Sequence, residues 1–218
     1  GQSSTARRRP MDGPRLLFVG RVSPEKGVHT LIEAFRLVLK RCPGATLELV
    51  GPRADLPQRY LVGLSSDPLV KGLDRFYDSS GVPAYQHAVD DLIESCGVAA
   101  SVKFSGGLPH RDLIARYQSA DIIVNPSVSE SFGISVVEGM ACGLPVVGTA
   151  VGGMRETIVD RVTGRLVAAE DSDALAGAIL DIWANPSLAG DMGAAGRDRA
   201  VTMFSWRARA SRILTAYR

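Results

Sequence analysis

The stretch "DIIVNPSVSESFGISVVEGMACGLPVVGT", residues 121–149, holds the pattern of a strand, a helix and a second strand in one short run. Its two ends, residues 121–127 and 144–149, are short apolar runs typical of strands that are buried on both faces. Between them, residues 132–143 begin and end near glycines and predict a helix. A strand, a helix and another apolar strand in this order form the repeating unit of a parallel sheet.

The same alternation continues along the whole chain. Further strands are expected at 15–20, 45–51, 101–106 and 164–168, and further helices at 27–44, 84–97, 110–120, 171–186 and within 187–217. Residues 52–84, rich in Gly, Pro, Ser and Asp, predict a long excursion with one short helix. We therefore expect an α/β fold, with a doubly wound, Rossmann-like parallel sheet of about six strands and helices on both faces.

Composition limits the classes of function. The chain has 218 residues, 45% of them hydrophobic, and a net charge of +2, which gives no reason to expect a nucleic-acid partner. The basic cluster "ARRRP" lies in a polar segment, residues 1–13, that we expect to be disordered, ahead of one domain over 14–218. No apolar run reaches the roughly 18 residues of a membrane span.

The three cysteines, Cys42, Cys96 and Cys142, have neither metal-ligand nor CxxC spacing. They are interpreted as free thiols of a cytoplasmic protein. The motif "DSD" at 171–173 looks like a metal-binding signature, but its place before an apolar helix predicts a helix cap. We expect no metal and no other cofactor.

Candidate ligands follow the strand ends, because right-handed crossovers place all of these ends at one edge of the sheet. The first strand ends in "GRVSPEKG", with Gly20, then Arg21 and Lys26 before the next helix. Two cations beside a helix N-terminus can hold a phosphate. Loop cations that are simply solvated are the alternative at this point.

Two carboxylates stand on either side of a helix start. Glu130 precedes the helix, and Glu138 lies about 7 Å along it from Gly133. A diphosphate that caps this helix would meet one carboxylate on each side, and carboxylates suit the hydroxyl pairs of a sugar and a ribose. The residues alone leave another interpretation open, with Glu130 as an acid near a cap and Glu138 as an exposed helix residue.

"GRVSPEKG" (20–27) and "ESFGISVVEGMACGLPVVGTAVGGMRETIVDRVTGRLV" (130–167) resemble the donor-binding, C-terminal domain of GT-B family 4 retaining glycosyltransferases, the glycosyl transferases group 1. The resemblance runs from about residue 14 to the end of the chain. It implies the C-terminal half of a GT-B fold and a bacterial, cytoplasmic enzyme of carbohydrate biosynthesis. The substrate it implies is a nucleotide sugar, with a UDP-hexose favoured and GDP next.

The resemblance also implies residue roles. Arg21 and Lys26 would hold the donor diphosphate, Glu138 the ribose hydroxyls and Glu130 the hydroxyls of the transferred sugar. Arg21, Lys26 and Glu130 would thus be the catalytic set. The wider donor-binding set would add Gly20, Gly107, Leu108, Ser131, Phe132, Gly133, Ile134 and Glu138, with Gly107 and Leu108 near the base and the backbone of 132–134 near sugar and phosphate.

The implied reaction is a front-face displacement in which the departing diphosphate helps to deprotonate the acceptor. The protein would mainly stabilise the charge on that leaving group, without a metal. The half of the enzyme that normally carries the acceptor site is missing, so the chain alone is expected to be inactive. Membrane contact through that other domain stays open.

Two other classes of function remain. A non-catalytic module for a nucleotide or another phosphorylated ligand is one. An NAD-dependent oxidoreductase on the same sheet is the other, although "GTAVGG" at 148–153 lacks the GxGxxG spacing.

Three further residues carry expectations. Arg161 stands where the family usually has Gly, and we expect it to alter a turn and leave the site alone. His110 opens a helix after "GGLP" and is expected to cap it, with a place at the edge of the cleft as the alternative. Trp206, at helical spacing, is expected to be a core or packing residue rather than a platform for a sugar.

Overall fold

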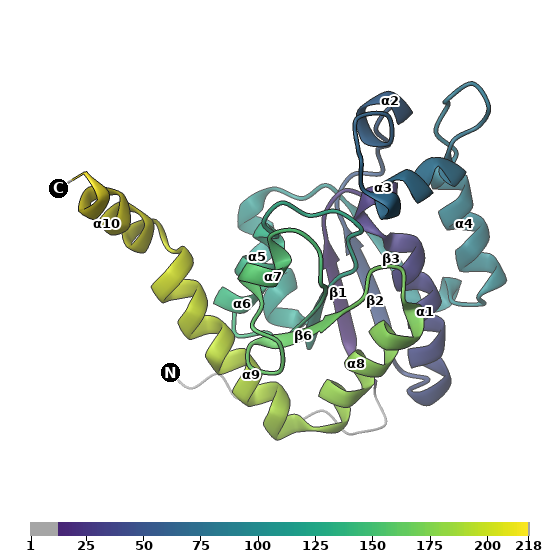
Figure 1. The fold of residues 1–218 in the computed structure, drawn as a ribbon. Coiled ribbons are helices and arrows are strands. Elements are labelled where there is room, and N and C mark those ends of the chain that lie inside the picture. The colour runs from purple at the N-terminus through teal and green to yellow at the C-terminus, as the bar shows by residue number, and fades with distance from the viewer. Residues whose placement is uncertain (1–12, 218) are drawn as a thin grey trace.

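A computed structural model of the chain describes residues 13–217, so the expected disorder of 1–13 lies, apart from Gly13, outside the described range. The chain forms a six-stranded sheet in the order β3-β2-β1-β4-β5-β6 (Figure 1). Every neighbouring pair is parallel. The strands are β1 (Arg15–Val19), β2 (Thr46–Val50), β3 (Val102–Gly106), β4 (Ile122–Asn125), β5 (Val146–Thr149) and β6 (Gly164–Val167). The predicted parallel sheet is confirmed.

Ten α-helices connect and cover these strands in the described range. They are α1 (Val28–Arg41), α2 (Gln58–Leu61), α3 (Pro68–Gly72), α4 (Tyr85–Ser95), α5 (His110–Ser119), α6 (Ile134–Ala141), α7 (Met154–Thr157), α8 (Ser172–Ala184), α9 (Pro186–Arg199) and α10 (Trp206–Ala216). Short 3-10 turns occupy Pro24–Lys26, Leu73–Phe76 and Ala99–Ser101, and a π-helical turn spans Ala200–Phe204. Asp171 caps α8 by accepting from the Ala174 amide, as expected.

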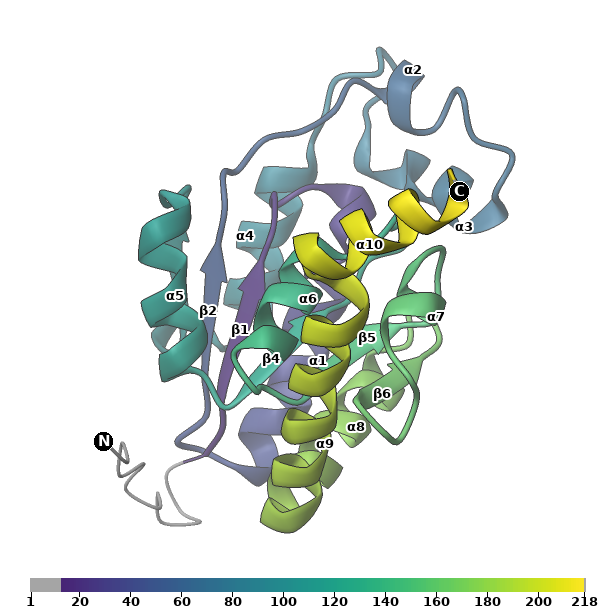
Figure 2. The ribbon, with the colours of Figure 1, turned by 90° about the vertical axis from the view of Figure 1, so that its left-hand side faces the viewer.

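The helices form two layers around the sheet. On one face, α1, α4 and α8 pack with Leu16 and Phe18 of β1 into the larger core. On the other face, Leu17 of β1 packs with residues of α5, α6 and α7 and with Ala200. Figure 2 shows α5, α6 and α9 in front of the strands and α1 and α8 behind them. Because side chains alternate along a strand, apolar strands such as β1 supply both cores.

The excursion between β2 and α4 is more structured than predicted. It contains two short helices, α2 and α3, and the 3-10 turn Leu73–Phe76, where the sequence indicated one short helix. A small separate core of Val70, Leu73 and Val128 attaches it to the loop after β4. Each helix is too short to show a clear apolar period, so the pattern could not reveal both.

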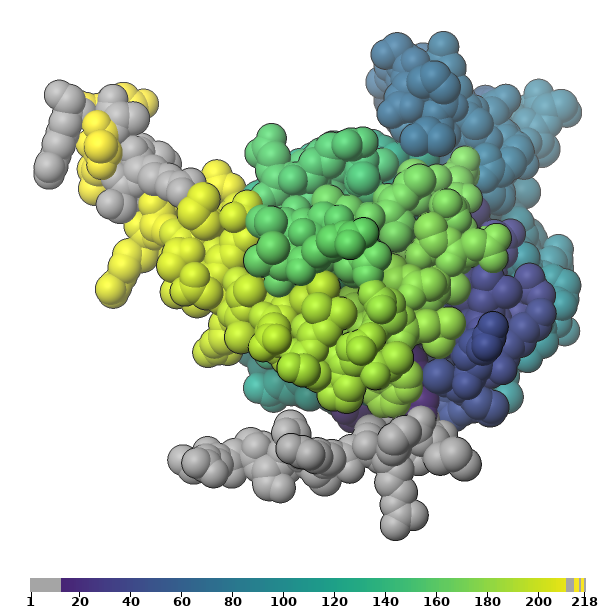
Figure 3. All heavy atoms as spheres, turned by 60° about the horizontal axis from the view of Figure 1, so that its bottom comes forward, coloured from purple at the N-terminus to yellow at the C-terminus, as the bar shows by residue number. Residues whose placement is uncertain are grey.

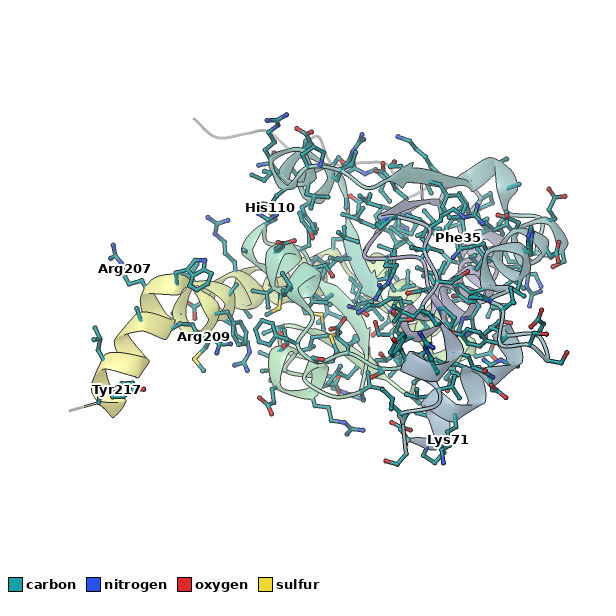
Figure 4. The ribbon with its side chains drawn as sticks, turned by 90° about the horizontal axis from the view of Figure 1, so that it is seen from above. Phe35, Lys71, His110, Arg207, Arg209 and Tyr217 are labelled. Atoms are coloured by element: carbon teal, nitrogen blue, oxygen red, sulfur yellow. The ribbon has the colours of Figure 1, made fainter. Side chains whose placement is uncertain are left out.

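The last helix stands apart from the body of the protein. Figures 3 and 4 show α10 projecting beyond the rest of the protein, and Figure 4 labels Arg207 and Arg209 on this helix and Tyr217 just after its end. Trp206 is 91% exposed, so the prediction that it is a core or packing residue is wrong. Among the described residues, no helix combines the length and apolarity that crossing a bilayer requires.

The turn before β6 explains the unusual Arg161. Its φ is 63°, in the left-handed region that favours glycine. The Arg161 amide donates to the Gly164 carbonyl over 2.7 Å, which closes the turn. Arg161 therefore adopts a backbone conformation that favours glycine, at a cost of about 1–2 kcal/mol.

We predict that Arg161→Gly raises the free energy of unfolding by about 0.5–1 kcal/mol, since relief of the strained φ outweighs the greater freedom of glycine in the unfolded chain. Arg161→Ala is the matched control, because it removes the exposed side chain and retains the strain. Urea unfolding of the three proteins measures the difference. A glycine variant no more stable than the alanine variant would contradict the prediction.

Candidate functional site

The site lies where β1 and β4 run side by side. β1 continues into a loop that leads to α1, and β4 into a loop that leads to α6. Because α1 and α6 cover opposite faces, the two loops diverge and leave a crevice at this edge. A cavity of about 310 Å³ opens there, lined by Phe18, Val19, Gly20, Lys26, Asn125, Glu130, Ile134, Ser135 and Glu138.

Lys26 and Glu130 join the two loops across the crevice. The Lys26 Nζ lies 2.7 Å from the Glu130 Oε2, and the two side chains are only 21% and 15% exposed. Burial alone would raise the pKa of Glu130. The hydrogen bond and charge of Lys26, helped by the amides of Phe132 and Gly133, outweigh this and lower that pKa below its ordinary value. Glu130 is therefore an anion that accepts hydrogen bonds.

Arg21 is held by its own loop. Its Nη2 donates to the Glu25 Oε1 over 3.1 Å, and its Nε to the Ser23 Oγ over 3.3 Å. Ser23 in turn donates to the same Glu25 oxygen over 2.7 Å. One guanidinium edge is thereby fixed, while the side chain remains 36% exposed. Arg21 does not line the cavity but adjoins it through Gly20.

Glu25 was missed by the sequence analysis. Glu25 is 6% exposed, and its Oε2 has no hydrogen-bond partner within the described residues. Its backbone carbonyl accepts from the amides of Val128 and Ser129. The buried residue thus orients Arg21 and ties the first loop to the second. The available signal was an acid next to the predicted clamp lysine in "PEKG".

Two glycines allow other segments to pack closely against the loop that carries Glu130. Gly133, with φ at 82°, directly precedes α6, and a Cβ there would lie 2.6 Å from the Met154 Sδ. A Cβ on Gly152 would lie 2.1 Å from the Glu130 carbonyl oxygen. The neighbouring Gly153 amide donates to that carbonyl. Gly152 and Gly153 of "GTAVGG" therefore serve contacts with this loop, and a Cβ on Gly148 would instead meet Met154 and Ile158.

Glu138 reaches the cavity from the second turn of α6. Its Oε2 accepts from the Tyr117 hydroxyl over 2.7 Å, and its Oε1 lies 3.5 Å from the His110 Nδ1. Both partners belong to α5. His110 is the first residue of α5, Pro109 is its N-cap residue and no side chain caps the helix, so the predicted capping role of His110 is wrong. Its 77% exposed side chain lies beside Glu138 at the rim of the cavity. The sequence analysis did not identify Tyr117.

The structure thus brings together most, but not all, of the predicted site residues. Gly20, Lys26, Glu130, Ile134 and Glu138 line one cavity, and Ser131, Phe132 and Gly133 lie on the loop between its two carboxylates. Gly107 and Leu108 do not line it, because they follow β3, two strands away from β1. Leu108 instead packs against the core beneath α5 and α6. Asn125 and Ser135 line the cavity but were not predicted.

Phe132 is held through both its carbonyl and its ring. The Phe132 carbonyl accepts from the Thr157 hydroxyl over 2.7 Å. Its ring packs edge-to-face on Phe204, with centroids 5.4 Å apart, beneath the Arg209 guanidinium. The C-terminal segment therefore braces the loop that holds Glu130.

A second cavity, of about 420 Å³, lies between α1, α4 and the excursion. It is lined by His29, Thr30, Glu33, Arg75, Phe76, Ala88, Leu92 and Glu170. None of the predicted site residues lies in it. Among residues 13–217, no group of three His, Cys, Asp or Glu side chains is arranged to hold a metal ion.

Solved structures of other proteins share this fold. The fold matches that of sucrose-phosphate synthase from Thermosynechococcus elongatus, with a TM-score of 0.74, 34% identity and coverage of 96% of this chain and 46% of that one. It also matches Alr3699/HepE of Anabaena, solved in complex with UDP, with a TM-score of 0.75, 24% identity and coverage of 95% and 49%. The fold is the C-terminal half of GT-B.

Residues 3–199 match the sequence profile of the family Glycosyl transferases group 1, and the chain belongs to this family. It is 33% identical to the D-inositol 3-phosphate glycosyltransferase of Frankia alni over 207 residues, which cover 95% of the chain and 46% of that relative. The chain therefore spans about half the length of the curated relatives it matches.

The Lys26–Glu130 pair generates a prediction about pH. Because the folded pKa of Glu130 lies below its ordinary value of 4.5, the pair stabilises the fold above about pH 4.5 and loses this effect as the pH falls through the folded pKa. We predict that Lys26→Met lowers the free energy of unfolding by about 1–2 kcal/mol at pH 7. The deficit should shrink below pH 4.5.

Urea unfolding at pH 7, 5, 4 and 3.5 measures this deficit. The double variant Lys26→Met/Glu130→Gln is the control, since it removes the unpaired charge and should recover part of the stability at pH 7. A deficit that stays constant from pH 7 to 3.5 would show that the ion pair is not its source.

Proposed function

We propose that the chain is the donor-binding half of a retaining glycosyltransferase that transfers a hexose from a nucleoside diphosphate sugar. The observation that carries the proposal is the convergence of Lys26, Glu130 and Glu138 on one cavity, with Arg21 beside it. A UDP sugar is the favoured donor, supported by the family and by a structural neighbour solved with UDP.

The diphosphate occupies the crevice between Lys26, Arg21 and the start of α6. The first amides of a helix and its dipole favour an anion, and Gly133 has no side chain to obstruct it. Lys26 already neutralises Glu130, so it can face the carboxylate on one side and a phosphate on the other. The guanidinium of Arg21 is fixed along one edge by Glu25 and Ser23, and its remaining N–H groups donate to the diphosphate.

The two glutamates recognise hydroxyls on either side of the diphosphate. Glu138, one and a half turns into α6, meets the ribose, and Glu130, before α6, meets the transferred sugar. Both are acceptors suited to neighbouring hydroxyl pairs. Glu130 is engaged by Lys26 and serves as a ligand for the sugar rather than as a nucleophile.

In the reaction, the bond between the anomeric carbon and the β-phosphate oxygen breaks. The acceptor oxygen forms its bond to the same carbon on the same face, and its proton passes to the departing diphosphate. Arg21, Lys26 and the α6 amides stabilise the charge that develops on that diphosphate. This assigns the catalytic work to fixed cations and dipoles of the chain.

The acceptor is bound by a second domain that completes the cleft. The curated relatives are about twice as long as this chain, which supports a partner domain of similar size. Closure of two such domains excludes water from the reacting groups.

An oxidoreductase with a dinucleotide is disfavoured by the same crevice. The loop after β1 carries Arg21 and Lys26 where the dinucleotide fold has a glycine-rich turn.

The first prediction from this proposal concerns the cations. Arg21→Ala and Lys26→Ala should each weaken UDP binding by about 1.5–3 kcal/mol, as for hydrogen bonds to charged groups, and leave uridine binding unchanged. Calorimetry compares them with Arg111→Ala and Lys40→Ala, which remove exposed cations away from the cavity. Equal losses for uridine and UDP would show that Arg21 and Lys26 do not contact the diphosphate.

The second concerns the carboxylates. Glu138→Gln should lower the affinity for UDP and for UDP-glucose alike, because both contain the ribose. Glu130→Gln should retain UDP affinity and remove only the extra affinity that the sugar contributes. The two variants are matched in chemistry, so each is the control for the other. If Glu130→Gln lowered the affinity for free UDP as strongly as the affinity for UDP-glucose, the roles assigned to the two glutamates would be wrong.

The third concerns the chain on its own. It should bind UDP with modest affinity but transfer no sugar, since it spans about half the length of its relatives and supplies one side of the proposed cleft. Incubation with UDP-glucose and candidate acceptors tests this by mass spectrometry. Turnover at about 1 per second or faster, a rate ordinary for enzymes, would overturn it.

A further inference from the structure

The carboxylate of Glu138 is held in place from the neighbouring helix. The Tyr117 hydroxyl donates to the Glu138 Oε2 over 2.7 Å, and the two residues lie 21 positions apart, on α5 and α6. Tyr117 is the one residue of α5 that is buried, at 2% exposure. The buried residue that anchors α5 in the core therefore also donates a hydrogen bond to a side chain of the site.

The hydroxyl is a permanent donor. Burial, followed by the hydrogen bond to Glu138 and its charge, raises the pKa of Tyr117 far above its ordinary value. The phenol therefore keeps its proton at neutral pH and donates a hydrogen bond to Glu138. A carboxylate that accepts from a fixed donor loses the freedom that an exposed glutamate side chain has.

The contact also gives the two carboxylate oxygens of Glu138 different surroundings. Glu138 lines the cavity, whereas Tyr117 does not and lies behind it. The Oε2 is engaged by Tyr117, and the Oε1 lies on the side of the exposed His110 at the cavity rim. One oxygen is thus used to set the position of the side chain, and acceptor capacity remains for a ligand.

We propose that Tyr117 is a positioning residue, which holds the Glu138 carboxylate ready for the ribose hydroxyl pair and so makes the site selective for ribonucleotides. This inference rests on the proposed function of the cavity. Pre-positioning matters because a side chain that is already fixed has less freedom left to lose when the ligand binds. Tyr117 contacts no substrate and acts only through Glu138.

The test is a ratio of affinities measured within each protein. Calorimetry gives the affinity for UDP, GDP and ADP and for their 2′,3′-dideoxy counterparts, in wild type, Tyr117→Phe, Glu138→Gln and the double variant. The phenylalanine keeps the buried ring and removes only the hydroxyl. Tyr60→Phe, at a tyrosine that is 57% exposed on α2, is the matched control.

In Tyr117→Phe we expect affinity for the ribonucleotide to fall about 5- to 10-fold and affinity for the dideoxy form to change less than 2-fold. Tyr60→Phe should leave both unchanged, and the double variant should match Glu138→Gln. Because a smaller folded fraction lowers both affinities equally, loss of stability does not move the ratio.

Equal weakening of the two ligand forms by Tyr117→Phe would reduce Tyr117 to a packing residue, and no weakening would remove its role altogether. Failure of the proposed function looks different. In that case wild type binds none of the nucleotides, or Glu138→Gln keeps the full preference for ribose. Either result overturns the inference together with its foundation.

Discussion

The parallel pairing of β1 with β4 is the constraint on which the rest of the site depends. Paired residues of these two strands are 106 positions apart in the chain, with Leu16 opposite Ile122. The helices that follow the strands, α1 and α6, pack on opposite faces of the sheet. The loops must therefore separate at this edge, and the crevice between them is a consequence of topology. Lys26 and Glu130 meet across it because each lies a few residues beyond its strand.

The ionic side chains around the crevice are held by partners within the protein. Lys26 faces Glu130, Arg21 faces Glu25, and Glu138 accepts from Tyr117. These contacts limit the cost of placing ionic groups in partly buried positions and hold them in defined directions. The proposed function uses them again: a diphosphate shares Lys26 and Arg21 with their carboxylates, and hydroxyls take the remaining acceptor positions of Glu130 and Glu138. The proposed function therefore draws on groups that the protein itself holds in fixed directions.

The sequence predicted the sheet and the central residues well because both have local signals. Apolar strands, glycine-bounded helices and cations after a strand are visible within a few residues of each other. What it missed depends on contacts between distant segments. Tyr117 looks like any aromatic residue of a helix until α5 packs beside α6, and Trp206 has helical spacing but no partner surface in the described chain. Gly107 and Leu108 came from the family resemblance, and their place after β3 leaves them outside the cavity.

The most direct measurement of the central claim is a crystal structure of the chain with UDP. The account predicts the diphosphate within hydrogen-bond distance, about 2.7–3.2 Å, of the Lys26 Nζ and of the first amides of α6, with the ribose on Glu138. UDP seated in the cavity between α1 and α4, beside His29 and Arg75, would contradict it. So would UDP at the β1–β4 edge with its diphosphate turned away from Lys26.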